Sequence, residues 1–330
     1  TSRNSRVAKP AAIVLVMLGH FATGIPGFWM LVTVGLFVFG FSSGYFTSLR
    51  YHEGFRWGPF WRRKAVRLLP HLLGADLFLL ALFLTRGREG IWTWQTLLGV
   101  TGLKGFLTWL GLPNPSPYGA GVWFLTLLLL FYAIYPLLRL AVRRRAGAVA
   151  LTAVGLAATL LLQWLVPMGH MLWLTAWAFV FGVAAERLAM RVSAWWPGAA
   201  AAGLALALGA LNANGVGGEA MNFLLLVGLC VSATMWIKSA ALLGTALAPL
   251  GALSGCLLEM YLLHAYLHVS TGGGRLADLA VSVALVVAVS WLLAAGIDQA
   301  TKRLFSPRPR GSRAVAGGPA AATGEAEATS

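Results

Sequence analysis

Residues 122–138 read VWFLTLLLLFYAIYPLL, without a single charged side chain. An apolar stretch of about this length is typical of a helix that crosses the hydrocarbon core of a membrane. After a short basic connection, residues 147–167 repeat the pattern as GAVALTAVGLAATLLLQWLVP. Hydrophobic residues make up 58% of the chain and charged residues 11%, about half the charged share of soluble domains. The length alone would allow two soluble domains, but this composition predicts one membrane bundle.

Comparable apolar stretches recur along the chain. They predict an all-α integral membrane protein, a bundle of about ten transmembrane helices. Their approximate bounds are 10–26, 28–49, 69–85, 122–138, 147–167, 171–186, 197–213, 220–237, 249–270 and 276–300.

One further stretch, residues 91–112, contains Lys104 and four glycines. The basic residues decide whether it spans, because cytoplasmic loops carry an excess of lysine and arginine. If it does not span and the N-terminus is inside, 21 of the 25 basic residues lie on the inner side. If it spans, the cluster from Arg139 to Arg145 faces outside. We therefore expect residues 87–121 to form an outer, non-spanning segment, with both termini in the cytoplasm.

The two ends of the chain differ from its apolar body. From residue 306 the chain is small, polar and rich in proline and glycine, which predicts a disordered cytoplasmic tail at 306–330 after a membrane domain at 1–305. Residues 1–9 are basic, but the stretch after them lacks a small-residue cleavage site, so we expect no cleaved signal peptide. We expect a multi-pass protein of the inner (plasma) membrane of a bacterial cell.

Charge and cysteine content disfavour several kinds of site. The net charge is +15, but the basic residues lie between apolar stretches, where they set orientation, so we expect no nucleic-acid partner. Cys230 and Cys256 lie inside apolar stretches and are interpreted as small core residues. His264 and His268 share a helix face but lack a third ligand, and no HExxH or CxxC pattern occurs, so we expect no metal.

His20 is the leading candidate for chemistry, because an ionisable side chain in the hydrocarbon region is costly. Imidazole can take and return a proton near neutral pH; the alternative is a neutral histidine that bridges two helices. Lys9 precedes it by eleven residues, about 16 Å along the same helix face. This spacing suits a long anionic ligand whose charged end stays in the cytoplasm. The alternative for Lys9 is an anchor at the helix end.

The predicted inner connection, residues 50–70, reads RYHEGFRWGPFWRRKAVRLLP. Arg63 and Arg67 are four residues apart and share a face if this stretch is helical. Guanidinium groups suit phosphates, although most such loops only set topology and meet lipid headgroups. The density of arginine just before Pro70, with Arg62 also present, favours a ligand.

A transporter or export factor without covalent chemistry is the alternative function. Asp76, Glu259 and His264 lie in predicted spans and could relay protons. The sequence shows no internal repeat, which argues mildly against a transporter.

Five segments, in this order, resemble the membrane acyltransferase-3 family, whose members acylate sugars, glycans and secondary metabolites. The resemblance covers about residues 9–300. The segments are AIVLVMLGHF (12–21), GLFVFGFSSGYF (35–46), FWRRKAVRLLP (60–70), VWFLTLLLLFYAIYPLL (122–138) and SGCLLEMYLLHAYLH (254–268).

The resemblance implies an O-acyltransferase that uses acyl-CoA, with acetyl-CoA the expected co-substrate, and a hydroxyl-bearing acceptor. It implies that His20 is the catalytic general base. The residues expected to hold the coenzyme A headgroup are Lys9, Arg62, Arg63 and Arg67. The residues expected to contact substrate are Ser43, Tyr45, Trp123 and His264, with Ser43 or Tyr45 a candidate for stabilising the oxyanion.

Two positions depart from the family pattern. Lys9 stands where the family often has arginine, so the charge is kept but the bidentate geometry is lost. The segment VWFLTLLLLFY lacks the acid that glycan O-acetylases often carry there. This disfavours a peptidoglycan or O-antigen acceptor and leaves room for a small hydrophobic one, such as a glycosylated natural product.

Overall fold

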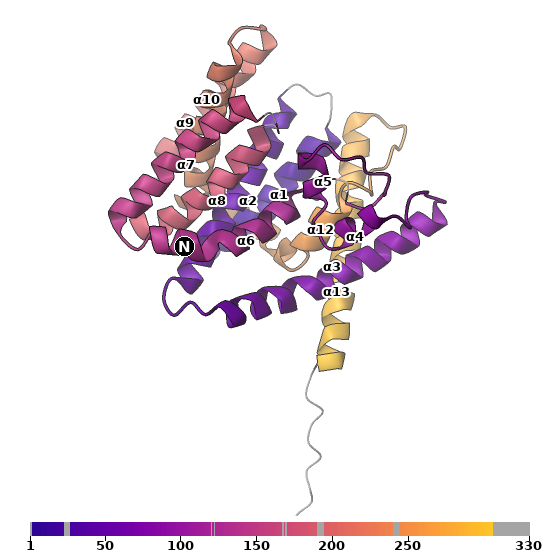
Figure 1. Cartoon of the computed structure of the whole chain (residues 1–330). Coiled ribbons are helices and arrows are strands. Elements are labelled where there is room, and N and C mark those ends of the chain that lie inside the picture. The colour runs from indigo at the N-terminus through magenta and orange to yellow at the C-terminus, as the bar shows by residue number, and fades with distance from the viewer. Residues whose placement is uncertain are drawn as a thin grey trace, which may run out of the picture.

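A computed structural model describes residues 2–22, 27–119, 121, 123–166, 168, 170–189, 195–239 and 245–305. Within these residues every regular element is helical, as predicted (Figure 1). The elements are α1 (Ser2–Phe21), α2 (Phe28–Tyr51), α3 (Trp57–Thr85), α4 (Trp94–Val100), α5 (Gly105–Trp109), α6 (Trp123–Ala141), α7 (Arg145–Leu165), α8 (His170–Leu188), α9 (Trp195–Ala213), α10 (Glu219–Ser239), the 3₁₀ helix η1 (Ala248–Gly255), α12 (Leu257–Leu263) and α13 (Arg275–Phe305). The predicted tail at 306–330 lies outside the described residues.

Seven of the described helices are long and apolar enough to cross a membrane: α2, α3, α6, α7, α9, α10 and α13. Helix α1 carries a shorter apolar stretch, Val7–Phe21. The protein is therefore a multi-pass membrane protein. A total of about ten spans and the inward termini stay predictions.

The prediction of one continuous span at 249–270 is wrong. The segment forms η1 and then the short helix α12, and the helix ends at Leu263. Pro249 lies in the first turn of η1, and Gly251 and Gly255 follow within it. Proline removes a backbone donor and glycine favours other conformations, so this sequence disfavours a continuous α-helix. The break places α12 beside the polar residues described below.

The connection at residues 50–70, predicted to lie on the inner side, is more regular than expected, because α3 begins at Trp57 and continues through Pro70. The arginines before Pro70 therefore lie on a helix and have fixed directions. Farther along α3, Leu69, Leu73 and Leu77 are spaced by four residues and are each more than half exposed. An outward row of leucines is expected of a helix face in contact with lipid tails.

In the segment predicted to be non-spanning, 87–121, the described residues form two short helices, α4 and α5. Lys104 Nζ donates a hydrogen bond to the Tyr118 carbonyl at 2.6 Å, and the Tyr118 hydroxyl donates to the Asp76 carbonyl of α3 at 3.1 Å. Burial lowers the pKa of Lys104 and raises the pKa of Tyr118 to about 12. The first bond connects two parts of the segment, and the second attaches the segment to α3.

Helix α2 lies at the centre of the bundle, between α1 and α8 (Figure 1). Its contact with α8 depends on two glycines. A Cβ added at Gly44 would collide with the Phe179 carbonyl, and one added at Gly182 would collide with the Phe41 carbonyl. Small residues let helix backbones approach closely in membranes, where packing and not water drives association. This contact fixes α2, which carries one wall of the site.

Candidate active site

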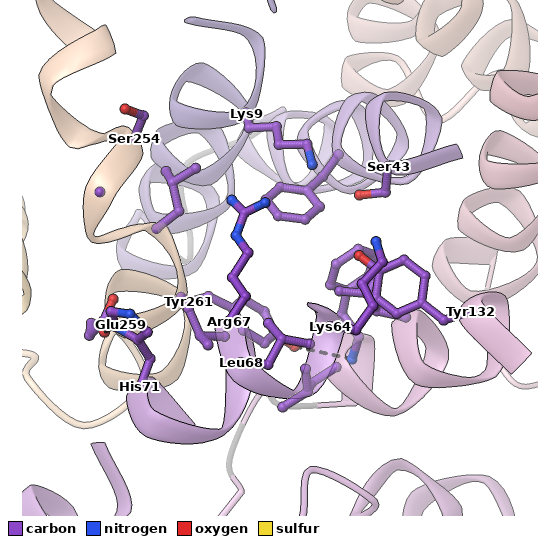
Figure 2. A pocket seen from close by; sticks show the side chains of 17 residues that line it. Lys9, Ser43, Lys64, Arg67, Leu68, His71, Tyr132, Ser254, Glu259 and Tyr261 are labelled. Atoms are coloured by element: carbon purple, nitrogen blue, oxygen red, sulfur yellow. Dashed lines mark hydrogen bonds and ion pairs between the residues drawn. The ribbon is translucent and has the colours of Figure 1, made fainter. Parts of the chain in front are cut away.

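A cavity of about 140 Å³ lies between α1, α2, α3, α6 and the η1–α12 segment (Figure 2). Lys9 of α1, Ser43 of α2, and Lys64 and Arg67 of α3 line it. Figure 2 shows Lys9 and Arg67 reaching toward the same space from opposite helices. Lys64, Arg67 and His71 are three and four residues apart, which places them on one face of α3. All three line the cavity.

Two of the cations of this cavity, Lys9 and Lys64, lie over aromatic rings. Lys64 Nζ lies 3.6 Å from the centroid of the Tyr132 ring, and Lys9 Nζ lies 5.5 Å from that of Phe39. Such rings attract a cation but carry no net charge. No carboxylate among the described residues pairs with Lys9, Lys64 or Arg67. The cavity therefore presents excess positive charge and suits an anionic ligand.

One acidic side chain lines the same cavity. Glu259, at the start of α12, is fully buried, and its Oε1 is hydrogen-bonded to His71 Nδ1. The other ring nitrogen of His71 lies 3.6 Å from Asp298 Oδ1 on α13. The second carboxyl oxygen of Glu259, Oε2, is buried and has no hydrogen-bond partner among the described residues.

A second, more open cavity lies at the other end of α1. Its lining includes His20, Gly121, His264 and His268. The ring centroids of His20 and His264 are 5.2 Å apart. His264 Nδ1 lies 2.7 Å from the Tyr261 carbonyl, and because a carbonyl only accepts, Nδ1 carries the proton. In neutral His264 this leaves Nε2 as an acceptor.

Tyr261 stands between the two cavities. It lines the first, and its ring centroid lies 5.8 Å from that of His264 in the second. Its hydroxyl donates to the Gly121 carbonyl at 2.6 Å and accepts from the Phe124 backbone N–H at 3.1 Å. The Tyr261 side chain thus connects α12 to the start of α6. A ligand that extends from one cavity to the other would pass along Tyr261.

The η1–α12 segment runs alongside α1 in the same direction. A Cβ built at Gly251 would lie 3.9 Å from Val7, near the start of α1, whereas His264 lies beside His20, at the end of α1. Both chain segments therefore lead from the basic cavity toward the histidine pair.

A family model described as an acyltransferase domain matches residues 7–295. The chain belongs to the acyltransferase-3 family. The match begins in α1 and ends in α13, so it contains both cavities. Comparisons with curated proteins and with solved structures found no match.

The structure of this acyltransferase brings together only some of the residues singled out from the sequence. Lys9, Ser43 and Arg67 line the basic cavity, and His20 and His264 line the second. The remaining four line neither cavity: Arg62, Arg63, Tyr45 and Trp123.

Each of these four has a different environment. Arg62 and Arg63 are exposed on α3. Tyr45 packs against Lys238 of α10, whose Nζ lies 4.8 Å from the Tyr45 ring centroid. Trp123 is half-buried beside Phe124. Since Ser43 and Tyr45 lie away from the histidine cavity, the geometry gives no support to an oxyanion role for either beside His20.

Sequence reasoning missed Lys64, His71, Tyr132 and Tyr261 as lining residues, and it did not place Glu259 in a donor site. A helical projection of α3 would have found two of them, because Lys64 and His71 flank Arg67 at helical spacing. Tyr132 and Tyr261 come from other helices, and nothing in the local sequence pairs them with α3. Among the described residues no group of three or more His, Cys, Asp or Glu side chains could hold a metal ion.

Proposed function

We propose that this acyltransferase moves an acyl group, acetyl in the first instance, from cytoplasmic acyl-CoA to a hydroxyl group. The acceptor is a sugar, a glycan or a glycosylated secondary metabolite. The observation that carries the proposal is the arrangement along α1. A cavity with three cations and no carboxylate paired to them lies at one end, and a histidine pair lies at the other.

Coenzyme A has the matching shape and charge. Its phosphates suit Lys9, Lys64 and Arg67, with Arg67 able to offer two parallel N–H groups. From Lys9 to His20 is eleven residues, about 16 Å along a helix. The pantetheine arm is a long chain that separates the phosphates from the thioester, so one donor can occupy the basic cavity and present its acyl group to His20.

His20 is the proposed general base. It accepts the proton of the acceptor hydroxyl while the hydroxyl oxygen attacks the thioester carbonyl. The carbon–sulfur bond breaks, the ester carbon–oxygen bond forms, and the proton passes from the imidazolium to the leaving thiolate. The transfer is thus balanced without a metal or a redox group. Holding donor and acceptor together beside His20 supplies a large part of the acceleration.

The second cavity is the proposed site of the acceptor. His20, Ala265 and His268 are exposed in it, so a hydroxyl compound can reach the imidazole without crossing the basic cavity. His264 Nε2 is available there to accept a hydrogen bond from the acceptor or from His20.

The direct test is turnover of acetyl-CoA labelled in the acetyl group by the purified protein in lipid nanodiscs, with a panel of sugars and glycosides. The proposal requires release of free thiol together with label in an ester of the acceptor. Transport of a glycoside across vesicles without thiol release would support the transporter alternative and contradict the proposal.

A further inference from the structure

The basic cavity is not uniformly basic, because Glu259 lies within its lining. Glu259 is 0% exposed, and His71 occupies only one of its two carboxyl oxygens. Oε2 is buried without a partner among the described residues. A buried carboxylate oxygen without a hydrogen bond costs free energy, since it has lost water and gained nothing in return. A ligand donor in the cavity would remove that cost.

The phosphate groups of the donor cannot be that partner. An ionised carboxylate only accepts hydrogen bonds, and phosphate oxygens are acceptors that also carry negative charge. The partner must be a neutral or cationic N–H or O–H group of the ligand. Coenzyme A has such groups on the side of the phosphates that leads to the thioester: a hydroxyl group next to the phosphates, and beyond it the two amide N–H groups of the pantetheine arm, which lie closer to the thioester.

The position of Glu259 agrees with this order. On α3, Lys64 and Arg67 precede His71, and His71 holds Glu259. On α12, Glu259 precedes His264 by five residues, about 7.5 Å along a helix. The lining thus runs from cations through a carboxylate to the histidine pair. Acyl-CoA runs in the same sequence from phosphates through amides to the thioester. Figure 2 shows Glu259 and His71 together at one side of the space into which Lys9 and Arg67 reach.

We propose that Glu259 is a donor-binding residue whose free carboxyl oxygen accepts a hydrogen bond from a pantetheine amide N–H. His71 is the positioning residue that holds the carboxyl group toward the cavity. This inference deepens the proposed function and rests on it. It also assigns a basis for selecting pantetheine-bearing donors over other phosphate compounds, because a nucleotide without the arm leaves the carboxyl oxygen unpaired.

The test compares two probes on the full-length protein in nanodiscs: coenzyme A, and 3′-phosphoadenosine 5′-diphosphate, which carries the phosphates without the arm. Glu259→Gln removes the charge and keeps the shape. It should weaken coenzyme A binding about 10- to 100-fold, the range for a hydrogen bond to a charged group, and leave the nucleotide unchanged. An equal loss for both probes, or no loss for either, overturns the inference.

Asp76→Asn is the matched control. Asp76 is also a buried carboxylate with an unpartnered oxygen, but it does not line the cavity. This variant should bind both probes as the unmodified protein does, and a loss that matches Glu259→Gln would contradict the inference.

A second measurement needs no variant. If Glu259→Gln fails to fold, the unmodified protein is tested with a coenzyme A analogue whose amide N–H groups are replaced by CH₂. Binding at least tenfold weaker than that of coenzyme A supports the inference, and equal binding overturns it. A protein that binds coenzyme A no better than the nucleotide contradicts only the role of Glu259. A protein that binds neither contradicts the proposed donor itself.

Discussion

His20 and His264 come from distant parts of the sequence, yet their ring centroids lie 5.2 Å apart. His264 is buried and its Nδ1 is bonded to the Tyr261 carbonyl, whereas His20 is exposed in the cavity that both rings line. Lys9, eleven residues before His20, lines the other cavity. Donor binding is therefore assigned to the part of α1 around Lys9, and proton transfer to its C-terminal end at His20. Mutations should affect donor affinity and transfer rate separately.

Arg67 and Arg63 lie four residues apart on α3 but have different expected effects. Arg67 lines the basic cavity, and Arg63 is exposed outside it. Arg67→Ala should raise the dissociation constant of acetyl-CoA about 10- to 100-fold, because it removes a charge-assisted contact to phosphate. Isothermal titration calorimetry on the protein in nanodiscs measures this dissociation constant.

Arg63→Ala is the control for that experiment, since it removes the same charge from the same helix. It should leave the dissociation constant of acetyl-CoA near that of the unmodified protein. Equal weakening by both variants would mean that the helix acts through its general positive potential, and the cavity assignment would then be wrong.

Gly44 should tolerate no side chain. Gly44→Ala places a Cβ against the Phe179 carbonyl and should lower the free energy of unfolding by about 1–3 kcal/mol, as overpacking does. Gly203→Ala is the control, because nothing lies within 4 Å of a Cβ at that exposed position of α9. It should be neutral or stabilising by up to about 1 kcal/mol, owing to the higher helix propensity of alanine. Thermal unfolding in detergent distinguishes them, and an equal response would contradict the close α2–α8 contact.

The topology predicted from charge can be tested with single cysteines. Leu112 is 45% exposed in the segment predicted to be outside, and Ala146 is exposed at the start of α7. A membrane-impermeant thiol reagent added to whole cells should label Leu112→Cys and should label Ala146→Cys only after lysis. The native cysteines, Cys230 and Cys256, are buried and should give little background. Labelling of position 146 from outside would contradict the prediction that both termini lie in the cytoplasm.

Apolar length predicted most of the helices, because the bilayer requires hydrogen-bonded backbone over a fixed thickness. Hydropathy failed at 249–270, where composition suits a span but Pro249 and the glycines favour η1 and a short α12. Hydropathy is an average over a window, and such local backbone preferences are lost in it.

Site residues that lie on the same helix could be predicted from the sequence. Contacts between residues of different helices could not. Helical periodicity predicted that Lys9 and His20 lie on one helix face and that Arg67 is a candidate ligand residue. In the structure Lys9 and Arg67 line the basic cavity, and His20 lines the second cavity. Arg63 and Arg67 lie one turn apart on the same face of α3, and only Arg67 lines the cavity. Which turn of α3 meets the cavity depends on how the helix packs against α12 and α13, and local sequence does not contain that information. The pairing of His71 with Glu259 needs the fold itself, because the two residues are 188 positions apart.

The acid limb of the pH profile provides a further prediction about His20. Only neutral imidazole can accept a proton, so transfer should fall as pH drops through the pKa of His20, while binding of acetyl-CoA through Lys9, Lys64 and Arg67 should persist. Steady-state rates at saturating donor and acceptor between pH 5 and 9, with donor affinity at each pH, measure the two separately. A rate that is independent of pH over the whole range would argue against a histidine base.

The role of His20 as the general base is tested by the rate of acetyl transfer by His20→Gln at saturating donor and acceptor. Glutamine keeps polarity and approximate size but cannot act as a base. His52→Gln is the control, because it also replaces an imidazole with an amide but at a residue that lines neither cavity. We expect a rate about 10²–10⁴-fold lower for His20→Gln, with unchanged affinity for acetyl-CoA and an unchanged unfolding temperature. A folded His20→Gln protein that transfers acetyl groups at nearly the unmodified rate would contradict this role of His20.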